Sequence, residues 1–173
     1  MEGEIKNRVA NSKLVTIDLD TLYPKGDRIT IDISQWLFQG LIVREKEFRV
    51  QLKEHNWEQY KDKYVALYCS TDAIIPGWAY LLITTHLQSI AKYITQGTTE
   101  ELDSLLLSEV IHAMDFSEFE NKPVIINGCS NHPIPESSYL LLLQKLMPIA
   151  RSIMYGEACS SVPLFKRSVK NRA

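Results

Sequence analysis

The chain has three cysteines, and each of them is followed by a serine: Cys69, Cys129 and Cys159. Asp72 stands three residues after Cys69, and His132 stands three residues after Cys129. Thiolate, carboxylate and imidazole groups at such spacing are ligands for tetrahedral zinc or for an iron–sulfur species. The sequence therefore predicts a metal site made by the three cysteines, with Asp72 or His132 as the fourth ligand.

Two other interpretations of the same residues stay open. A thiol at a helix N-terminus has a lowered pKa, so Cys129 or Cys69 could be the nucleophile of a thiol-dependent enzyme. Free cysteine is also often a small buried hydrophobic residue, which would make the chain a non-catalytic interaction module. In that case Asp72 is a helix cap and His132 a surface turn residue.

The elements that must position these residues are predicted by an internal repeat over residues 63–97 and 122–156. Each copy has a short apolar run that ends in Cys-Ser, a loop that ends in proline, an apolar helix and a second short apolar run before a glycine. Strand, loop, helix and strand in this order form a crossover unit, so we expect an α/β fold with a parallel or mixed sheet. Cys69 and Cys129 then lie at the carboxyl ends of strands, where ligand sites gather.

The first sixty residues are expected to form a hairpin and a helix. Residues 13–19 and 28–33 alternate apolar and polar side chains, and residues 24–27 have turn composition, which predicts an antiparallel pair. Helical spacing predicts a helix within residues 44–57. A capping box predicts another helix from Thr98 to about residue 114.

Two features concern the second copy of the repeat and the end of the chain. Pro148 should end or kink the second repeat helix near Met147. The basic residues of 166–173 predict a disordered tail, with a phosphate-binding arm as the alternative.

Bulk composition restricts the class of protein. The 173 residues, 45% of them hydrophobic, suit a single domain over 1–173, and a formal net charge of −2 favours neither nucleic acid nor an anionic membrane as a partner. The chain starts with an acidic segment and has no apolar run of membrane-spanning length, so it is expected to be cytoplasmic and without a signal peptide. An odd cysteine count without an export signal argues against a disulfide framework.

Several segments carry a resemblance to a known family. They are Glu2-Gly3-Glu4-Ile5 with Asn7-Arg8-Val9-Ala10, Trp36-Leu37-Phe38 with Gly40-Leu41, Lys63-Tyr64-Val65-Ala66-Leu67, and Pro163-Leu164 with Phe165-Lys166-Arg167. Over essentially its whole length the chain resembles an uncharacterised bacterial family catalogued as domain of unknown function 2480. The resemblance implies no activity and no catalytic residues. It implies a setting near iron–sulfur cluster assembly components, and hence metal-handling or iron–sulfur assembly proteins as partners.

Overall fold

The structure is a computed structural model that describes residues 14–128, 131–157 and 160–167. The chain divides into two compact units, and each has its own parallel β-sheet. Unit 1 is made of Met1–Tyr23 and Leu106–Ala173, and unit 2 is the segment Pro24–Leu105 between them. The prediction that 1–173 behave as one domain stays a prediction.

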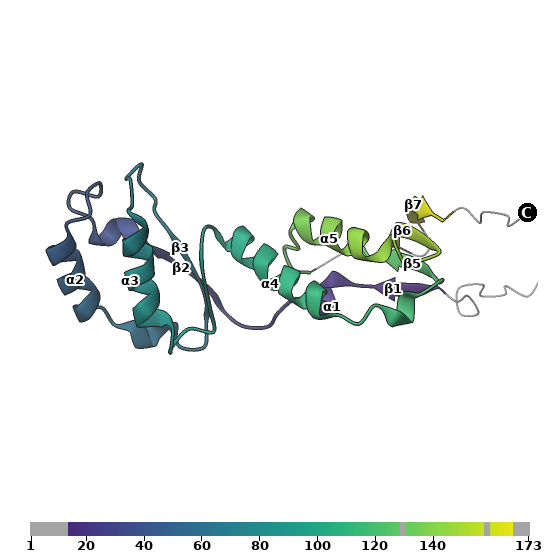
Figure 1. The fold of residues 1–173 in the computed structure, drawn as a ribbon, viewed down its shortest axis with the longest axis horizontal. Helices are drawn as coiled ribbons and strands as arrows, with labels where there is room; N and C mark the ends of the chain where they lie inside the picture. The colour runs from purple at the N-terminus through teal and green to yellow at the C-terminus, as the bar shows by residue number, and fades with distance from the viewer. Residues whose placement is uncertain (1–13, 129–130, 158–159, 168–173) are drawn as a thin grey trace, which may run out of the picture. The chain divides into compact units, whose positions relative to one another are not determined.

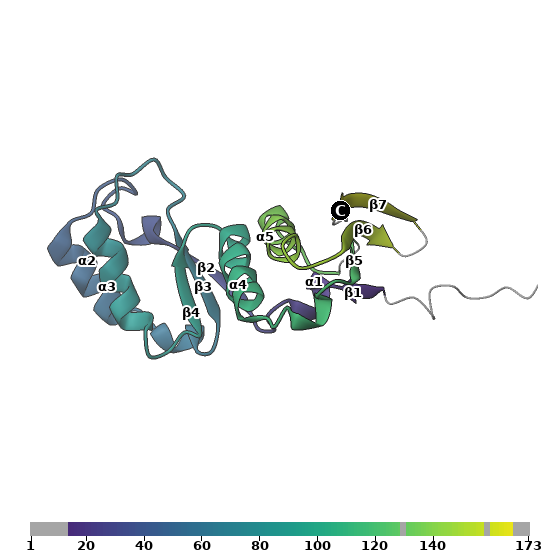
Figure 2. The ribbon, with the colours of Figure 1, turned by 45° about the vertical axis from the view of Figure 1, so that its right-hand side comes forward.

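Unit 2 is a β-α-β-α-β arrangement. Its sheet has the order β2-β3-β4, with all strands parallel, and α2 and α3 lie side by side on one face of it (Figures 1 and 2). In chain order its elements are β2 (Arg28–Asp32), η1 (Ile33–Trp36), α2 (Glu45–Glu54), η2 (Trp57–Tyr60), β3 (Tyr64–Tyr68), α3 (Gly77–Leu87) and β4 (Tyr93–Gln96). The predicted crossover unit over 63–97 is therefore present as β3, α3 and β4.

The core of unit 2 joins the two helices to the central strand. Phe48 and Leu52 of α2 are fully buried, as are Ile83 of α3 and Val65 of β3. Trp57 fixes the end of α2, because its indole N–H donates a hydrogen bond of 2.8 Å to the Leu52 carbonyl. Each fully buried aliphatic or aromatic side chain contributes about 1.5–3 kcal/mol, so this core holds the helices to the sheet.

Unit 1 has the same plan with one strand added. Its sheet has the order β1-β5-β6-β7, in which β1, β5 and β6 are parallel and β7 is antiparallel to β6. Its elements are β1 (Val15–Ile17), α1 (Leu19–Leu22), the second part of α4 (Thr99–Ala113), η3 (Ser117–Phe119), β5 (Pro123–Ile126), α5 (Glu136–Leu146), β6 (Ser152–Glu157) and β7 (Ser160–Lys166). The second predicted crossover unit is present as β5, α5 and β6.

The predicted N-terminal strands and helix are present, but the two strands do not pair with each other. β1 pairs with β5 in unit 1 and β2 pairs with β3 in unit 2, both in parallel. Ile17 and Ile31 are buried in two different cores, and an aspartate caps a helical turn directly after each strand. The segment 24–27 therefore joins two units and does not form the turn of a hairpin.

Three smaller expectations can be compared with the structure. The chain leaves α5 after Leu146, with Met147 as its C-cap, which agrees with the effect predicted for Pro148. Lys166 is the last residue of β7, so the segment assigned to a tail begins inside a strand, while 168–173 lie outside the described residues. Over the part of the chain that the structure describes, no helix has both the length and the apolar character that a membrane crossing requires.

Candidate functional site at the carboxyl edges of the sheets

In unit 2, a carboxylate at the end of the first strand holds the loop that follows the second strand. Asp32 ends β2 and accepts hydrogen bonds from the Ser70 amide at 3.1 Å and from the Ser70 hydroxyl at 2.6 Å. It also caps η1 by accepting from the Ser34 amide. Burial of this carboxyl raises its pKa, but the hydrogen bonds from Ser70 and Ser34 outweigh that effect and bring the pKa to about 2. Asp32 therefore fixes the Cys-Ser loop as an ionised group.

Cys69 lines a hollow of about 380 Å³ at the carboxyl ends of β3 and β4. Its Sγ lies 3.3 Å from the Thr71 hydroxyl, and that hydroxyl donates to the Gly40 carbonyl at 2.6 Å. A threonine has one hydroxyl hydrogen, which is used by Gly40, so the sulfur must be the donor in its contact with Thr71.

Tyr80 and Gln96 line the same hollow. Burial raises the pKa of Tyr80 above its usual value, and the neighbouring Cys69 raises it further when its thiol is ionised, while a hydrogen bond from Gln96 opposes the shift. Tyr80 therefore keeps its proton at neutral pH and is a hydrogen-bond donor, not a base. Over the part of the chain that the structure describes, no imidazole or carboxylate lines this hollow.

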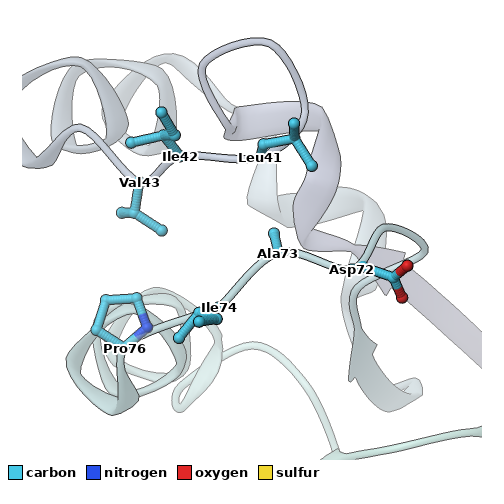
Figure 3. A pocket seen from close by; sticks show the side chains of 7 residues that line it. All are labelled: Leu41, Ile42, Val43, Asp72, Ala73, Ile74 and Pro76. Atoms are coloured by element: carbon cyan, nitrogen blue, oxygen red, sulfur yellow. The ribbon is translucent and has the colours of Figure 1, made fainter.

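Asp72 belongs to a different depression of unit 2, with a volume of about 550 Å³. Leu41, Ile42 and Val43 form one side of it, and Figure 3 shows the Asp72 carboxylate pointing away from them at its rim. Asp72 is also no helix cap, since the N-cap of α3 is Pro76 and has no side-chain capping bond. Cys69 and Asp72 thus face different hollows, and the capping role suggested by the sequence is wrong.

In unit 1 the corresponding loop is held by a second carboxylate, two residues beyond the strand-ending aspartate. Asp20 Oδ1 accepts from the backbone amides of Asn131 at 2.8 Å and His132 at 2.9 Å, and it lies 2.7 Å from His132 Nδ1. Asp20 Oδ2 accepts from the Asn131 side-chain amide at 3.2 Å. The backbone and ring hydrogen bonds of His132 lower the pKa of Asp20 most. Burial opposes them, the hydrogen bonds from Asn131 lower the pKa further, and the result is a pKa of about 2.

The contact with Asp20 decides which nitrogen of His132 carries a proton. Because Asp20 is ionised at neutral pH and can only accept, Nδ1 of His132 must donate. In the neutral imidazole the basic lone pair is then on Nε2. The ring of Tyr23 stacks on the imidazole at 4.4 Å between centroids and limits its rotation. His132 therefore has a fixed tautomer and a fixed orientation.

The structure shows in which unit some of the residues predicted to bind a metal lie. Cys129 and Cys159 lie outside the described residues, while Cys69 and Asp72 are in unit 2 and His132 is in unit 1. Within residues 14–128, 131–157 and 160–167, no group of three histidine, cysteine, aspartate or glutamate side chains has the arrangement of a metal site. The metal, cofactor and partner predictions remain predictions.

Sequence reasoning missed the two carboxylates that hold the loops. For Asp32 the signal is the tripeptide Thr-Ile-Asp, which occurs at Thr30-Ile31-Asp32 and again at Thr16-Ile17-Asp18, two residues before Asp20. Asp32 is the last residue of β2 and Asp18 directly follows β1, and each accepts from the amide two residues later. Asp18 also reaches the loop after β5, because its Oδ2 lies 3.1 Å from Asn127 Nδ2. The recurrence of Thr-Ile-Asp thus indicates that Asp18 and Asp32 hold equivalent places in the two units.

Comparison with known proteins gives one match. The family described as protein of unknown function DUF2480 matches residues 3–167. No match was found among curated proteins or among solved structures. Since the match extends over nearly the whole chain, this protein belongs to the DUF2480 family.

Proposed function

We propose that the protein is a thiol-dependent enzyme in which Cys129 is the nucleophile, His132 the base and Asp20 the residue that positions the base. The observation that supports this most is the 2.7 Å contact between Asp20 and His132 Nδ1. A carboxylate on Nδ1 leaves Nε2 as the proton acceptor, which is the arrangement that activates serine or cysteine nucleophiles in unrelated enzymes. Cys129 precedes this histidine by three residues in the sequence.

In this mechanism His132 Nε2 takes the proton of the Cys129 thiol, and the thiolate attacks an electrophilic carbon of the substrate. The imidazolium returns the proton to the leaving group as that group departs. Asp20 stays ionised throughout and stabilises the imidazolium, as its pKa of about 2 requires. The place also fits the proposal, because the carboxyl ends of parallel strands are where ligands bind in α/β sheets.

Cys69 is the weaker nucleophile of the two candidates. Its thiol donates to Thr71, and the residues that line its hollow include no base. It is the matched reference thiol for an experiment on Cys129, since both follow the central strand of a parallel unit.

The test is the pH dependence of alkylation at each cysteine of the full chain, followed by peptide mass spectrometry with iodoacetamide. We expect Cys129 to react with an apparent pKa below the ~8.5 of a free thiol. The variants His132→Gln and Asp20→Asn should move this value back toward ~8.5 and leave the Cys69 profile unchanged. A Cys129 profile centred near ~8.5 that neither variant moves would remove the proposal.

A second candidate function is metal or iron–sulfur binding through Cys129, Cys159 and His132, in a protein accessory to metal or cluster handling. The Asp20–His132 contact favours it as well, because metal-ligating histidines usually donate their other ring N–H to a carboxylate. Metal analysis of protein purified anaerobically without chelator distinguishes the two. About one equivalent of zinc or iron that is lost in both Cys129→Ser and His132→Gln would replace the enzyme proposal with this one.

A further inference from the structure

A hollow of about 510 Å³ lies in unit 1 where β6 begins and β7 ends. It is far in sequence from the Asp20–His132 contact and shares no residue with it. The residues that line it combine a basic group with an apolar group, and they are Arg151, Ser152, Ile153, Met154, Pro163, Phe165, Lys166 and Arg167. Among the residues that the structure describes, no acidic side chain lines the hollow.

The backbone holds the three cations of this hollow close together. Lys166 is paired with Ser152 across the antiparallel ladder, and the Arg167 amide donates to the Arg151 carbonyl at 2.9 Å. The Arg167 guanidinium donates to the Pro148 carbonyl, which directs part of this side chain. None of the three cations forms an ion pair with a carboxylate within the described residues. Three positive charges are thus gathered without an internal counter-charge.

The apolar part of the hollow comes from an irregularity in the same ladder. Ile153 is paired with Phe165 and Met154 with Pro163, so Leu164 is an extra residue on β7 and forms a bulge. Bulges change the direction of side chains and are frequent next to binding sites. Here the bulge leaves Phe165, Pro163 and Met154 on the wall of the hollow beside the cations.

We propose that this hollow is a binding site for a small organic phosphate, with the phosphate on Arg151, Lys166 and Arg167 and an apolar body against Phe165 and Met154. Guanidinium groups match the oxygens of a phosphate in two-point hydrogen bonds. Three cations also suit the double negative charge of a phosphate better than the single negative charge of a carboxylate. The short extent of the basic cluster and the net charge of −2 favour a small molecule over a nucleic-acid backbone, which requires a longer basic track. The proposal is independent of the thiol chemistry at Cys129.

Calorimetric titration of the full chain with phenyl phosphate, inorganic phosphate and phenol tests the proposal. We expect saturable binding of phenyl phosphate at low millimolar concentration or better. Inorganic phosphate should bind about tenfold more weakly because it lacks the apolar body, and phenol should not saturate. Failure of phenyl phosphate to bind, or equal affinity for the phosphate with and without the ring, would overturn the proposal.

Variants show whether binding occurs at these residues. Arg151→Gln and Lys166→Gln change exposed side chains, and each should weaken phenyl phosphate binding about tenfold, since each removes a charged hydrogen bond. Lys53→Gln, at an exposed position on α2, is the matched control and should leave the affinity unchanged. Equal affinities in all three variants would place the phosphate elsewhere. Binding of a single-stranded oligonucleotide that displaces phenyl phosphate and is weakened by the same variants would identify a nucleic-acid surface instead.

Discussion

Units 1 and 2 hold equivalent loops with different chemistry. Unit 2 uses the aspartate that ends its first strand, Asp32, to bind Ser70, and within the described residues no imidazole or carboxylate lines the hollow of its thiol at Cys69. In unit 1 the second carboxylate, Asp20, binds the loop at His132, whereas Ser34 stands at the corresponding place in unit 2. The same scaffold thus provides a mainly structural loop in one unit and a positioned imidazole in the other. This difference is the reason why the proposed nucleophile and base are both assigned to unit 1.

The units also differ at the position two residues before the repeated Thr-Ile-Asp. Counted from the repeated Thr-Ile-Asp, Leu14 of unit 1 corresponds to Arg28 of unit 2. Arg28 forms an ion pair of 2.9 Å with Asp103, and the two side chains are only 13% and 3% exposed. The first strand of unit 2 is therefore fixed by a buried charge pair where unit 1 has an apolar residue.

The largest effect we predict is on this ion pair. Asp103→Asn leaves the Arg28 charge buried without its partner, and we expect the free energy of unfolding to fall by about 3–5 kcal/mol. Urea unfolding of the full chain measures it, with Glu100→Gln, an exposed position on the same helix, as the control.

A double variant tests whether an apolar pair can replace the ion pair of unit 2. Arg28→Leu with Asp103→Leu gives unit 2 the apolar character of unit 1 at this position, and it should recover much of the stability lost in Asp103→Asn. If Asp103→Asn is no less stable than the Glu100→Gln control, the ion pair does not hold the first strand of unit 2.

A second prediction concerns acid stability, to which both loop contacts contribute. The pKa values of Asp20 and Asp32 are about 2 in the folded chain against an ordinary value of 3.8. A carboxyl with a lowered folded pKa stabilises the protein above its unfolded pKa, and this contribution is lost as pH falls from about 3.8 through about 2.

Asp20→Asn and Asp32→Asn should each flatten the decline of stability over this pH range and lower stability at pH 7. Chemical unfolding monitored by circular dichroism at several pH values measures both effects. Asp27→Asn, which changes an exposed aspartate, is the control and should keep the wild-type slope. A wild-type slope in the Asp20 and Asp32 variants would show that these carboxylates do not anchor the loops.

The sequence predicts the repeated crossover units well, because Cys-Ser, proline and glycine recur in the same order in both copies. It fails for β1 and β2, since alternation of apolar and polar residues identifies a strand but not its partner. In the candidate site the sequence identifies His132 and Cys69, because both belong to the Cys-Ser segment that recurs in the two copies. It misses Asp20, because a contact across 112 residues leaves no local pattern. Only the recurrence of Thr-Ile-Asp indicated that a strand-ending carboxylate belongs to each unit.

The smallest effect we predict comes from building the chemistry of unit 1 into unit 2. Ser34→Asp with Asp72→His places an aspartate and a histidine at the positions that Asp20 and His132 occupy in the other unit. If this pair activates thiols, the apparent pKa of Cys69 in alkylation should fall by about one unit, as expected for a thiol that gains a cationic neighbour. Asp72→His alone is the control, because its imidazole lacks the positioning carboxylate and should have a smaller effect. An unchanged Cys69 profile in a folded double variant would mean that the difference between the units lies in the remaining loop residues, and not in the aspartate–histidine pair.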